Sequence, residues 1–400
     1  MSTPTEEERA TASTGGVGEV FAAFLPLGLT AFGGPVAHLG FFRTEFVERR
    51  RWLSDAAYGD LVALCQFMPG PASSQVGMAL GLRRAGLGGL FAAWTAFTLP
   101  SAIALTLFAL VLGVSGVEAG AGWLLGLKAA AVAVVANALL GMAASLAATR
   151  GRATIAAGAA IAILLSPSLV AAQLAAIAVG GLAGLALADV PAGEGSAPPA
   201  APVGKAVGVA ALIAFAGGLV VLPLLAGLSP ALDLLDRTYR AGALVFGGGH
   251  VVLPLLQGEM AGMVDETAFL AGYGAAQAVP GPLFTFAAFL GAVAEPFGGV
   301  AGAAVALVGI FLPSLFLVLG VIPFWEELRR ARLARRLLAG VNAAVVGLLA
   351  AAFYDPVFVR GIGGVAALAL AIAAFVALKI WRVPPWLVVV AAAGAGGVLL

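Results

Sequence analysis

Charged residues are scarce in this sequence, and cysteine and histidine are nearly absent. Only 10% of the 400 residues are charged and 62% are hydrophobic, whereas a typical soluble domain carries about 25% charge. The single cysteine, Cys65, excludes an internal disulfide and a metal site built from several cysteines. The net charge of +1 and the short, separate basic runs argue against a nucleic-acid partner. The composition predicts an all-α polytopic membrane protein, surrounded by the lipid bilayer and holding no cofactor.

Two Pro-Gly-Pro triplets interrupt long apolar segments. Pro69-Gly70-Pro71 lies within residues 56–82, and Pro280-Gly281-Pro282 lies within residues 267–295. Proline cannot continue a helix, but it is favoured as the first residue of a new one. Each half-segment has about 13 residues, or roughly 20 Å of helix, too short for the ~30 Å hydrocarbon layer. Each triplet therefore predicts a broken helix, which in transporters marks a binding site.

The motifs around the triplets occur twice. Phe32-Gly33-Gly34-Pro35 is matched by Phe246-Gly247-Gly248-Gly249, Pro100-Ser101 by Pro313-Ser314, and Gly126 to Ala130 by Gly340 to Ala344. The offsets between partners stay between 211 and 214 residues, which indicates a duplicated domain. The polar N-terminus lacks the basic region of a signal peptide, so we expect the first apolar stretch to be retained. The expected divisions are a tail (1–16), an N-terminal transmembrane repeat (17–188), a linker with a connecting helix (189–227) and a C-terminal transmembrane repeat (228–400).

The basic residues favour one topology. If the Gly-Gly and Pro-Gly-Pro segments are re-entrant, all but four of the 21 basic residues avoid the outer face and the membrane. The exceptions are Arg237, Arg240 and Arg360 outside, and Lys128 within a span. This arrangement satisfies the positive-inside rule. The extra pass at 205–227 inverts the second repeat relative to the first. In the rival arrangement each broken segment crosses fully, which places Arg83-Arg84 outside.

Several of these motifs together carry a family resemblance. They are Phe32-Gly33-Gly34-Pro35, Trp52-Leu53-Ser54, the run from Gln66 to Pro71, and Gly340-Val341-Asn342-Ala343-Ala344. The chain resembles the long, two-domain form of the chromate ion transporter family. The resemblance implies chromate transport across the cytoplasmic (inner) membrane, usually as efflux that confers resistance, with sulfate as a structural mimic. It implies no enzyme activity.

The helix that follows the first triplet suits a tetrahedral dianion. Its first turn offers free backbone N–H groups, the positive end of the helix dipole, and the side chains of Ser73, Ser74 and Gln75. The second half has Leu283 and Phe284 instead, so we expect the anion to depend more on the first half. The alternative is that each triplet is only a kink. The candidate substrate-binding residues are Gly33, Gly34, Gln66, Pro69, Gly70, Pro71, Ser73, Ser74, Gln75, Lys128, Gly247, Gly248, Gln277, Pro280, Gly281, Pro282, Thr285 and Asn342.

Lys128 is the one basic residue expected deep in a span. An intramembrane charge costs at least ~2.5 kcal/mol on insertion scales, which indicates a counter-charge for the substrate or a proton carrier. The alternative is that Lys128 lies near the helix end and extends its amine to the surface. Asn342 occupies the matching position in the other half. For His38, beside the first Gly-Gly turn, a packed histidine is favoured over a titrating one.

Two other functions remain open from the sequence. One is a transporter of the same architecture for a different oxyanion or an organic anion. The other is a membrane enzyme, which would need convergent acids, bases, nucleophiles or metal ligands. The apolar spans hold almost no Asp, Glu, His or Cys, so the chain is not expected to be an enzyme. Transport direction, protons as the coupling ion and a homodimeric state are also left open.

Overall fold

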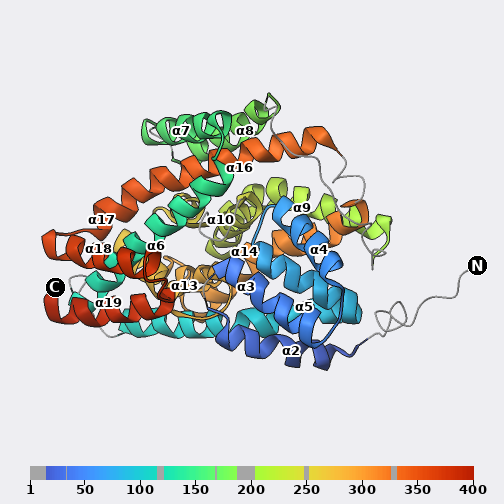
Figure 1. The fold of residues 1–400 in the computed structure, drawn as a ribbon, viewed down its shortest axis with the longest axis horizontal. Coiled ribbons are helices and arrows are strands. Elements are labelled where there is room, and N and C mark those ends of the chain that lie inside the picture. The colour runs from blue at the N-terminus through green and yellow to red at the C-terminus, as the bar shows by residue number, and fades with distance from the viewer. Residues whose placement is uncertain are drawn as a thin grey trace, which may run out of the picture.

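The computed structural model describes residues 15–32, 34–114, 121–166, 169–186, 203–246, 252–325 and 331–400. Helices and turns account for all the regular structure of these residues (Figure 1). Five of the helices in this part of the chain are long and apolar enough to span a membrane, which supports the predicted polytopic class. The first half comprises α2 (Val17–Thr30), α3 (Gly34–Phe42), a π-helical turn (Arg43–Arg49), α4 (Asp55–Phe67), α5 (Ala72–Val114), α6 (Gly122–Leu146), α7 (Arg150–Leu164) and α8 (Leu169–Gly184).

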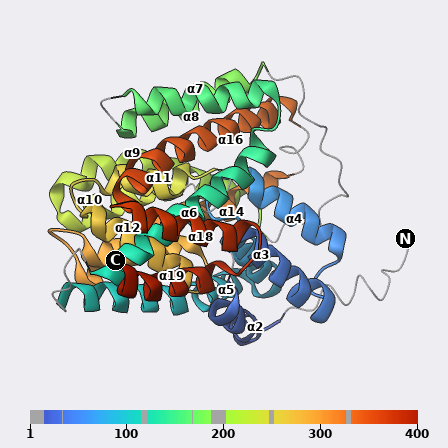
Figure 2. The same cartoon turned by 60° about the vertical axis from the view of Figure 1, so that its left-hand side comes forward.

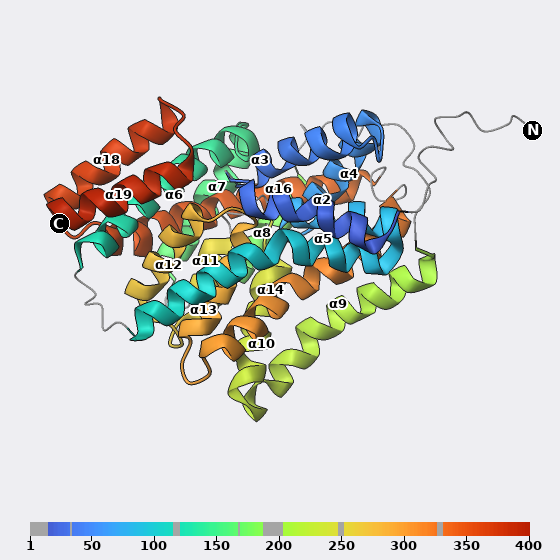
Figure 3. The same ribbon diagram turned by 90° about the horizontal axis from the view of Figure 1, so that it is seen from below.

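The second half repeats this order after a connecting helix, α9 (Lys205–Leu225), and a short 3₁₀ turn, η2 (Ala226–Leu228). Its elements are α10 (Pro230–Leu244), α11 (Val252–Met260), α12 (Glu266–Ala278), η4 (Leu283–Thr285), α13 (Phe286–Val293), α14 (Gly299–Val321), η5 (Ile322–Phe324), α16 (Arg332–Ala352), η6 (Phe353–Phe358), α17 (Val359–Gly361), α18 (Val365–Lys379) and α19 (Pro385–Leu399). Figure 3 shows α9 along an edge of the molecule, where Ile213 and Leu224 are 67% and 77% exposed. Such exposure suits a helix that faces lipid.

Both Pro-Gly-Pro triplets break their helices, as predicted. In the first half α4 ends at Phe67 and α5 begins at Ala72. In the second half α12 ends at Ala278, but the chain resumes in the 3₁₀ turn η4 before α13 begins. The expectation of an α-helix starting directly at Pro282 is therefore wrong in its first turn. Leu283 and Phe284 are buried there, and the Thr285 hydroxyl donates to the Pro282 carbonyl at 2.8 Å, which favours the tighter turn.

A sharp turn follows each break and leads into a hairpin of closely packed helices. α5 is interrupted at Ala85 and at Gly86, whose φ is +61°. The helix before this turn contacts the helix after it where Gly81 meets the Gly89 backbone. In the second half, Gly291 of α13 meets the Gly302 backbone of α14 in the same way. Small residues permit this close approach, so the two halves share a packing pattern as well as their motifs.

The last hairpin of each half packs on a long helix of the other half. The α7–α8 pair lies along α16, and the α18–α19 pair lies along α6 (Figures 1 and 2). Gly180 and Gly184 of α8 contact the backbone of α16 around Gly340, while Gly126 contacts the α19 backbone at Ala392. Backbone contact of this kind relies on van der Waals packing between small residues. Because each terminal hairpin packs on a helix of the other half, the glycine-bearing helix faces at these contacts are buried by the other half.

The two breaks are also joined to opposite halves by a reciprocal pair of hydrogen bonds. The Gly70 N–H donates to the Val245 carbonyl at 2.7 Å, and the Gly281 N–H donates to the Ala31 carbonyl at 2.9 Å. Both glycines have positive φ, +116° and +93°. A Cβ on Gly70 would stand 2.5 Å from Ser314 Oγ, and one on Gly281 would stand 2.9 Å from Ser101 Oγ. Each break is therefore seated in the other half, where only glycine fits.

We predict that Gly70→Ala destabilises the protein more than Gly262→Ala. Both residues have positive φ, so alanine pays about 1–2 kcal/mol of backbone strain at either position. A Cβ on Gly262 meets open space, whereas at Gly70 it meets Ser314 and Gln75, and overpacking adds about 1–3 kcal/mol. Thermal unfolding in detergent measures the difference. Equal losses of Tm for the two variants would contradict the seating of Gly70 described above.

Candidate functional site

The start of α5 is a buried polar cluster. Ser73, Ser74 and Gln75 are all buried. The Gln75 amide donates to the Pro69 carbonyl at 2.6 Å and lies 3.4 Å from Ser314 Oγ of the other half. Among the described residues, Ser74 Oγ and Gln75 Oε1 find no hydrogen-bond partner. Buried polar atoms are normally paired, so this helix start has spare hydrogen-bonding capacity.

His38 connects this cluster to the second break. Its Nε2 lies 3.1 Å from the Ala31 carbonyl, the same oxygen that accepts the Gly281 N–H. Its Nδ1 lies 3.3 Å from Ser73 Oγ. Because a carbonyl can only accept, Nε2 carries a proton and donates to Ala31. His38 is thus packed between the end of α2 and the start of α5, which agrees with the packed histidine expected from the sequence.

A polar cavity of about 280 Å³ lies one turn before the first break. It contains four polar side chains, those of Gln66 on α4, Arg152 on α7, and Arg335 and Asn342 on α16. Two guanidinium groups lie in its wall, and guanidinium forks match the oxygens of an oxyanion. Asn342 Oδ1 has no partner among the described residues. The remaining lining residues are Ala63, Phe67, Leu146, Leu338 and Ala339.

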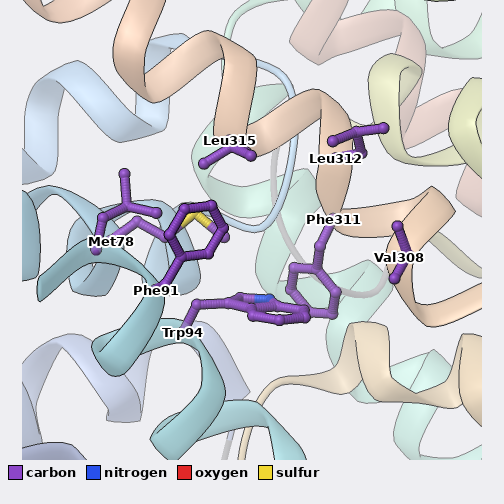
Figure 4. Close-up of a pocket in the computed structure, with 8 residues that line it drawn as sticks. Met78, Phe91, Trp94, Val308, Phe311, Leu312 and Leu315 are labelled. Carbon is purple, nitrogen blue, oxygen red and sulfur yellow. The ribbon is translucent and has the colours of Figure 1, made fainter. Parts of the chain in front are cut away.

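A second cavity, of about 140 Å³, is entirely apolar. It lies between α5 and α14, where Trp94 faces Phe311 with ring centroids 5.8 Å apart (Figure 4). The rest of its wall is formed by Met78, Leu90, Phe91, Val308, Leu312 and Leu315. Placing a dianion among such side chains would carry a large desolvation cost. The cavity beside Gln66 is therefore the better candidate for an anion.

Lys128 lies away from the polar cavity. It is the seventh residue of α6, is only 8% exposed, and interacts electrostatically with Asp265. Asp265 caps α12 by accepting from the backbone N–H groups of Thr267 and Ala268. Leu146, which lines the cavity, is at the other end of α6. Lys128 and the two cavity arginines are thus separated along a helix of 25 residues.

Comparison with known proteins identifies the family. A sequence model of the chromate transporter family matches residues 18–185 and 232–398. The chain belongs to the chromate transporter family. It is 30% identical over 359 residues to a chromate transport protein of Pseudomonas aeruginosa, an alignment that covers 84% of this chain and 80% of that protein. It is 26% identical over 346 residues to an uncharacterised transporter of Methanocaldococcus jannaschii, covering 83% and 82% of the two chains.

A third relative matches a shorter region. A chromate transport protein of Cupriavidus metallidurans is 35% identical over 131 residues, which is 32% of each chain. No solved structure matches the chain. The resemblance inferred from the motifs is therefore confirmed: this is a multi-pass membrane protein of a transporter family and not an enzyme.

The geometry divides the predicted site residues of this chromate transporter family member into groups. Pro69, Gly70, Pro71, Ser73 and Gln75 gather at the first break, and Pro280, Gly281, Pro282 and Thr285 gather at the second. Gln66 and Asn342 share the polar cavity. Lys128 joins neither group, and Gln277 is half-buried on α12, hydrogen-bonded to Tyr273. Gly34 begins α3, whereas Gly33, Gly247 and Gly248 lie outside the described residues.

Four polar residues of these sites were not among the predicted ones. Arg152 and Arg335 are among the basic residues that the topology expects on the cytoplasmic face, and both line the polar cavity. Ser101 and Ser314 served only to align the repeats, yet each lies against the opposite break. A hydroxyl residue after a matched proline in both halves was the available signal for the serines. The two arginines had no comparable signal, because their proximity depends on the packing of α7 against α16.

We predict that Arg152→Gln and Arg335→Gln each weaken the apparent affinity for chromate. Hydrogen bonds to charged groups are worth about 1.5–3 kcal/mol, so the half-saturation concentration should rise about tenfold or more. The control is Arg332→Gln, which removes an exposed arginine one turn earlier on α16. Concentration-dependent flux at matched expression is the measurement. If Arg332→Gln has the same effect as Arg335→Gln, general surface charge and not the cavity binds the anion.

Proposed function

We propose that this chain is a secondary transporter that carries chromate, with sulfate as a mimic, across the cytoplasmic membrane in the efflux direction. The observation that carries the proposal is the cavity lined by two arginines, a glutamine and an asparagine at the end of α4, where the broken segment is interrupted. Its 280 Å³ accommodates a tetrahedral dianion together with water, and its arginine, glutamine and asparagine side chains supply donors to oxyanion oxygens. Membership in the chromate transporter family and the named relatives support chromate as the substrate.

The proposed architecture is a pair of inverted repeats with re-entrant broken segments. In the first half the guanidinium groups of Arg50 and Arg84 both lie over the Trp52 ring, at 5.8 and 5.2 Å from its centre. Arg50 precedes α4 and Arg84 follows the first part of α5, so the broken segment returns to its starting point. In the second half the Glu295 N–H donates to the Met263 carbonyl at 2.9 Å, across the same kind of return. Both contacts support segments that enter and leave on one face.

The three arginines of the proposed outer face are each paired with acids. Arg240 bonds Asp236 at 2.9 Å and Glu259 at 3.0 Å, Arg237 bonds Asp233 at 2.8 Å, and Arg360 bonds Glu266 at 3.0 Å. Arginines of the opposite face are paired as well, Arg43 with Asp55, Arg50 with Glu45 and Arg84 with Glu19, so the orientation rests on the unequal number of basic residues on the two faces and not on their pairing. Arg152 and Arg335, at the opposite end of α6, would then open the polar cavity to the cytoplasm.

We place the deeper binding position at the start of α5. An anion in the cavity contacts Gln66, one turn before the break, and the first turn of α5, with Ser73 and Ser74, follows the break. A helix N-terminus holds oxyanions through these groups and its dipole. The buried Ser74 hydroxyl, which has no partner among the described residues and can donate to an oxyanion, supports this position. In the second half Leu283 and Phe284 replace the polar side chains, and Thr285 is already bonded to Pro282.

Flux in proteoliposomes tests the function. Purified protein should carry radiolabelled chromate, and more weakly sulfate, down an imposed gradient. A proton gradient that drives uphill flux would identify protons as the coupling ion. Empty liposomes and liposomes with the Arg152→Gln, Arg335→Gln double variant serve as controls. Flux of an organic anion in the absence of any chromate or sulfate flux would contradict the proposed substrate and favour the other transporter reading.

We predict that Ser74→Ala raises the half-saturation concentration for chromate more than Thr285→Ala. Ser74 has a buried hydroxyl without a partner among the described residues, whereas the Thr285 hydroxyl is bonded within its own turn. Losing one hydrogen bond to a charged ligand should weaken binding by roughly tenfold or more. Concentration-dependent uptake at matched expression compares the two. A larger effect of Thr285→Ala would place the substrate in the second half.

A further inference from the structure

Two of the helices that line the polar cavity, α4 and α16, have repeat partners elsewhere in the chain. An offset of 211 residues takes Gln66 and Ala63 on α4 to Gln277 and Gly274 on α12. An offset of 214 residues takes Asn342 on α16 to Lys128 on α6. The pair α4 and α16 therefore corresponds to the pair α12 and α6. Each pair joins a broken-segment helix of one half to a long helix of the other.

The two helix pairs are packed differently. α12 is in backbone contact with α6, because a Cβ on Gly274 would stand 2.7 Å from the Leu127 carbonyl oxygen. Ala63, the partner of Gly274, instead lines the open cavity between α4 and α16. Lys128 is correspondingly buried, while its partner Asn342 faces the cavity. One helix pair is thus open and its repeat partner is closed in the same molecule.

The chemistry of the two pairs is similar despite this difference. Each places a glutamine amide on the broken segment, Gln66 or Gln277, and a donor on the long helix, Asn342 or Lys128. The cationic side chains are Arg152 and Arg335 at the open pair, and Lys128, which also interacts with Asp265, at the closed one. An amide together with a cation provides charge-assisted donors to oxyanion oxygens. Both pairs therefore suit the same class of ligand.

We propose that Gln277 and Lys128 form a second site for a tetrahedral dianion, closed in this structure and opening to the outer face. The proposal rests on the proposed function. The second site opens when α12 separates from α6. In the same change α4 closes onto α16, so that only one of the two sites is open to the anion at a time. Helix interfaces of this kind hold two discrete arrangements and do not deform continuously. The two helix breaks, bonded at Gly70 and Gly281 to opposite halves, do not move relative to each other during this change.

A matched pair of cysteines tests the asymmetry. In a Cys65→Ala background, Leu338→Cys places a thiol in the open cavity, and Leu124→Cys places one at the equivalent buried position. A membrane-impermeant methanethiosulfonate reagent is applied to right-side-out and everted vesicles. We expect rapid modification of Leu338→Cys from the cytoplasmic face and slow modification of Leu124→Cys from the outer face. Equal rates at the two positions would overturn the proposal.

A larger side chain between α12 and α6 should favour the arrangement in which this helix pair is open. Gly274→Ala puts a methyl group against the Leu127 carbonyl. It should increase the modification rate of Leu124→Cys and decrease that of Leu338→Cys, each about fivefold. A fivefold change corresponds to about 1 kcal/mol in the equilibrium between the two arrangements. The control is Gly272→Ala on the same helix, whose methyl meets the Phe289 ring and not α6. Identical effects of Gly272→Ala and Gly274→Ala would overturn the proposed opening.

A third measurement does not use Gly274→Ala, so it remains possible if that variant fails to fold. Lys128→Gln should raise the half-saturation concentration for chromate about tenfold at the outer face and change it less than about twofold at the cytoplasmic face. Arg335→Gln should show the opposite pattern. If both variants act at the same face, or Lys128→Gln acts at neither, the second site is refuted. Absence of both chromate and sulfate flux would refute the proposed function. The modification rates of Leu338→Cys and Leu124→Cys would still show whether the two helix pairs differ in openness.

Discussion

The reciprocal bonding of the two helix breaks is the constraint on which the rest of this structure depends. A broken helix in a membrane leaves backbone groups that lipid cannot satisfy, so they need partners from the protein. Here the Gly70 N–H is satisfied by Val245 and the Gly281 N–H by Ala31, each from the opposite half. The two halves are therefore held together at their least helical points. The exchange of the terminal hairpins onto α16 and α6 extends the same interlocking outward.

This interlocking explains why polar groups converge where they do. Each break brings the start of a helix, with its free N–H groups and dipole, to the boundary between the halves. In the proposed function, an oxyanion binds at such a helix start without a full positive charge there. Full charges lie instead to the two sides, with Arg152 and Arg335 at one end of α6 and Lys128 near the other. In the proposed transporter these cations attract a dianion from either side.

The sequence predicted the breaks and the duplication because proline and glycine act locally. Pro69 to Pro71 ends a helix in any surroundings, and two copies in register require a repeat. Packing between the halves is a different matter. The polar cavity depends on α7 lying along α16, a contact between residues far apart in sequence. The 3₁₀ turn after Pro282 was likewise missed, because it depends on the burial of Leu283 and Phe284 and not on the triplet itself.

The central claim is that these interlocked halves are inverted repeats whose broken segments are re-entrant. Single cysteines at Arg51, Arg83 and Gly262, in a Cys65→Ala background, test it most directly when labelled with an impermeant thiol reagent in oriented vesicles. Arg51→Cys and Arg83→Cys flank the first broken segment, and Gly262→Cys precedes the second. The account predicts that the first two react from the cytoplasmic face and the third from the outer face. Labelling of Arg51→Cys and Arg83→Cys from opposite faces would show that the segment crosses the membrane, and would contradict the account.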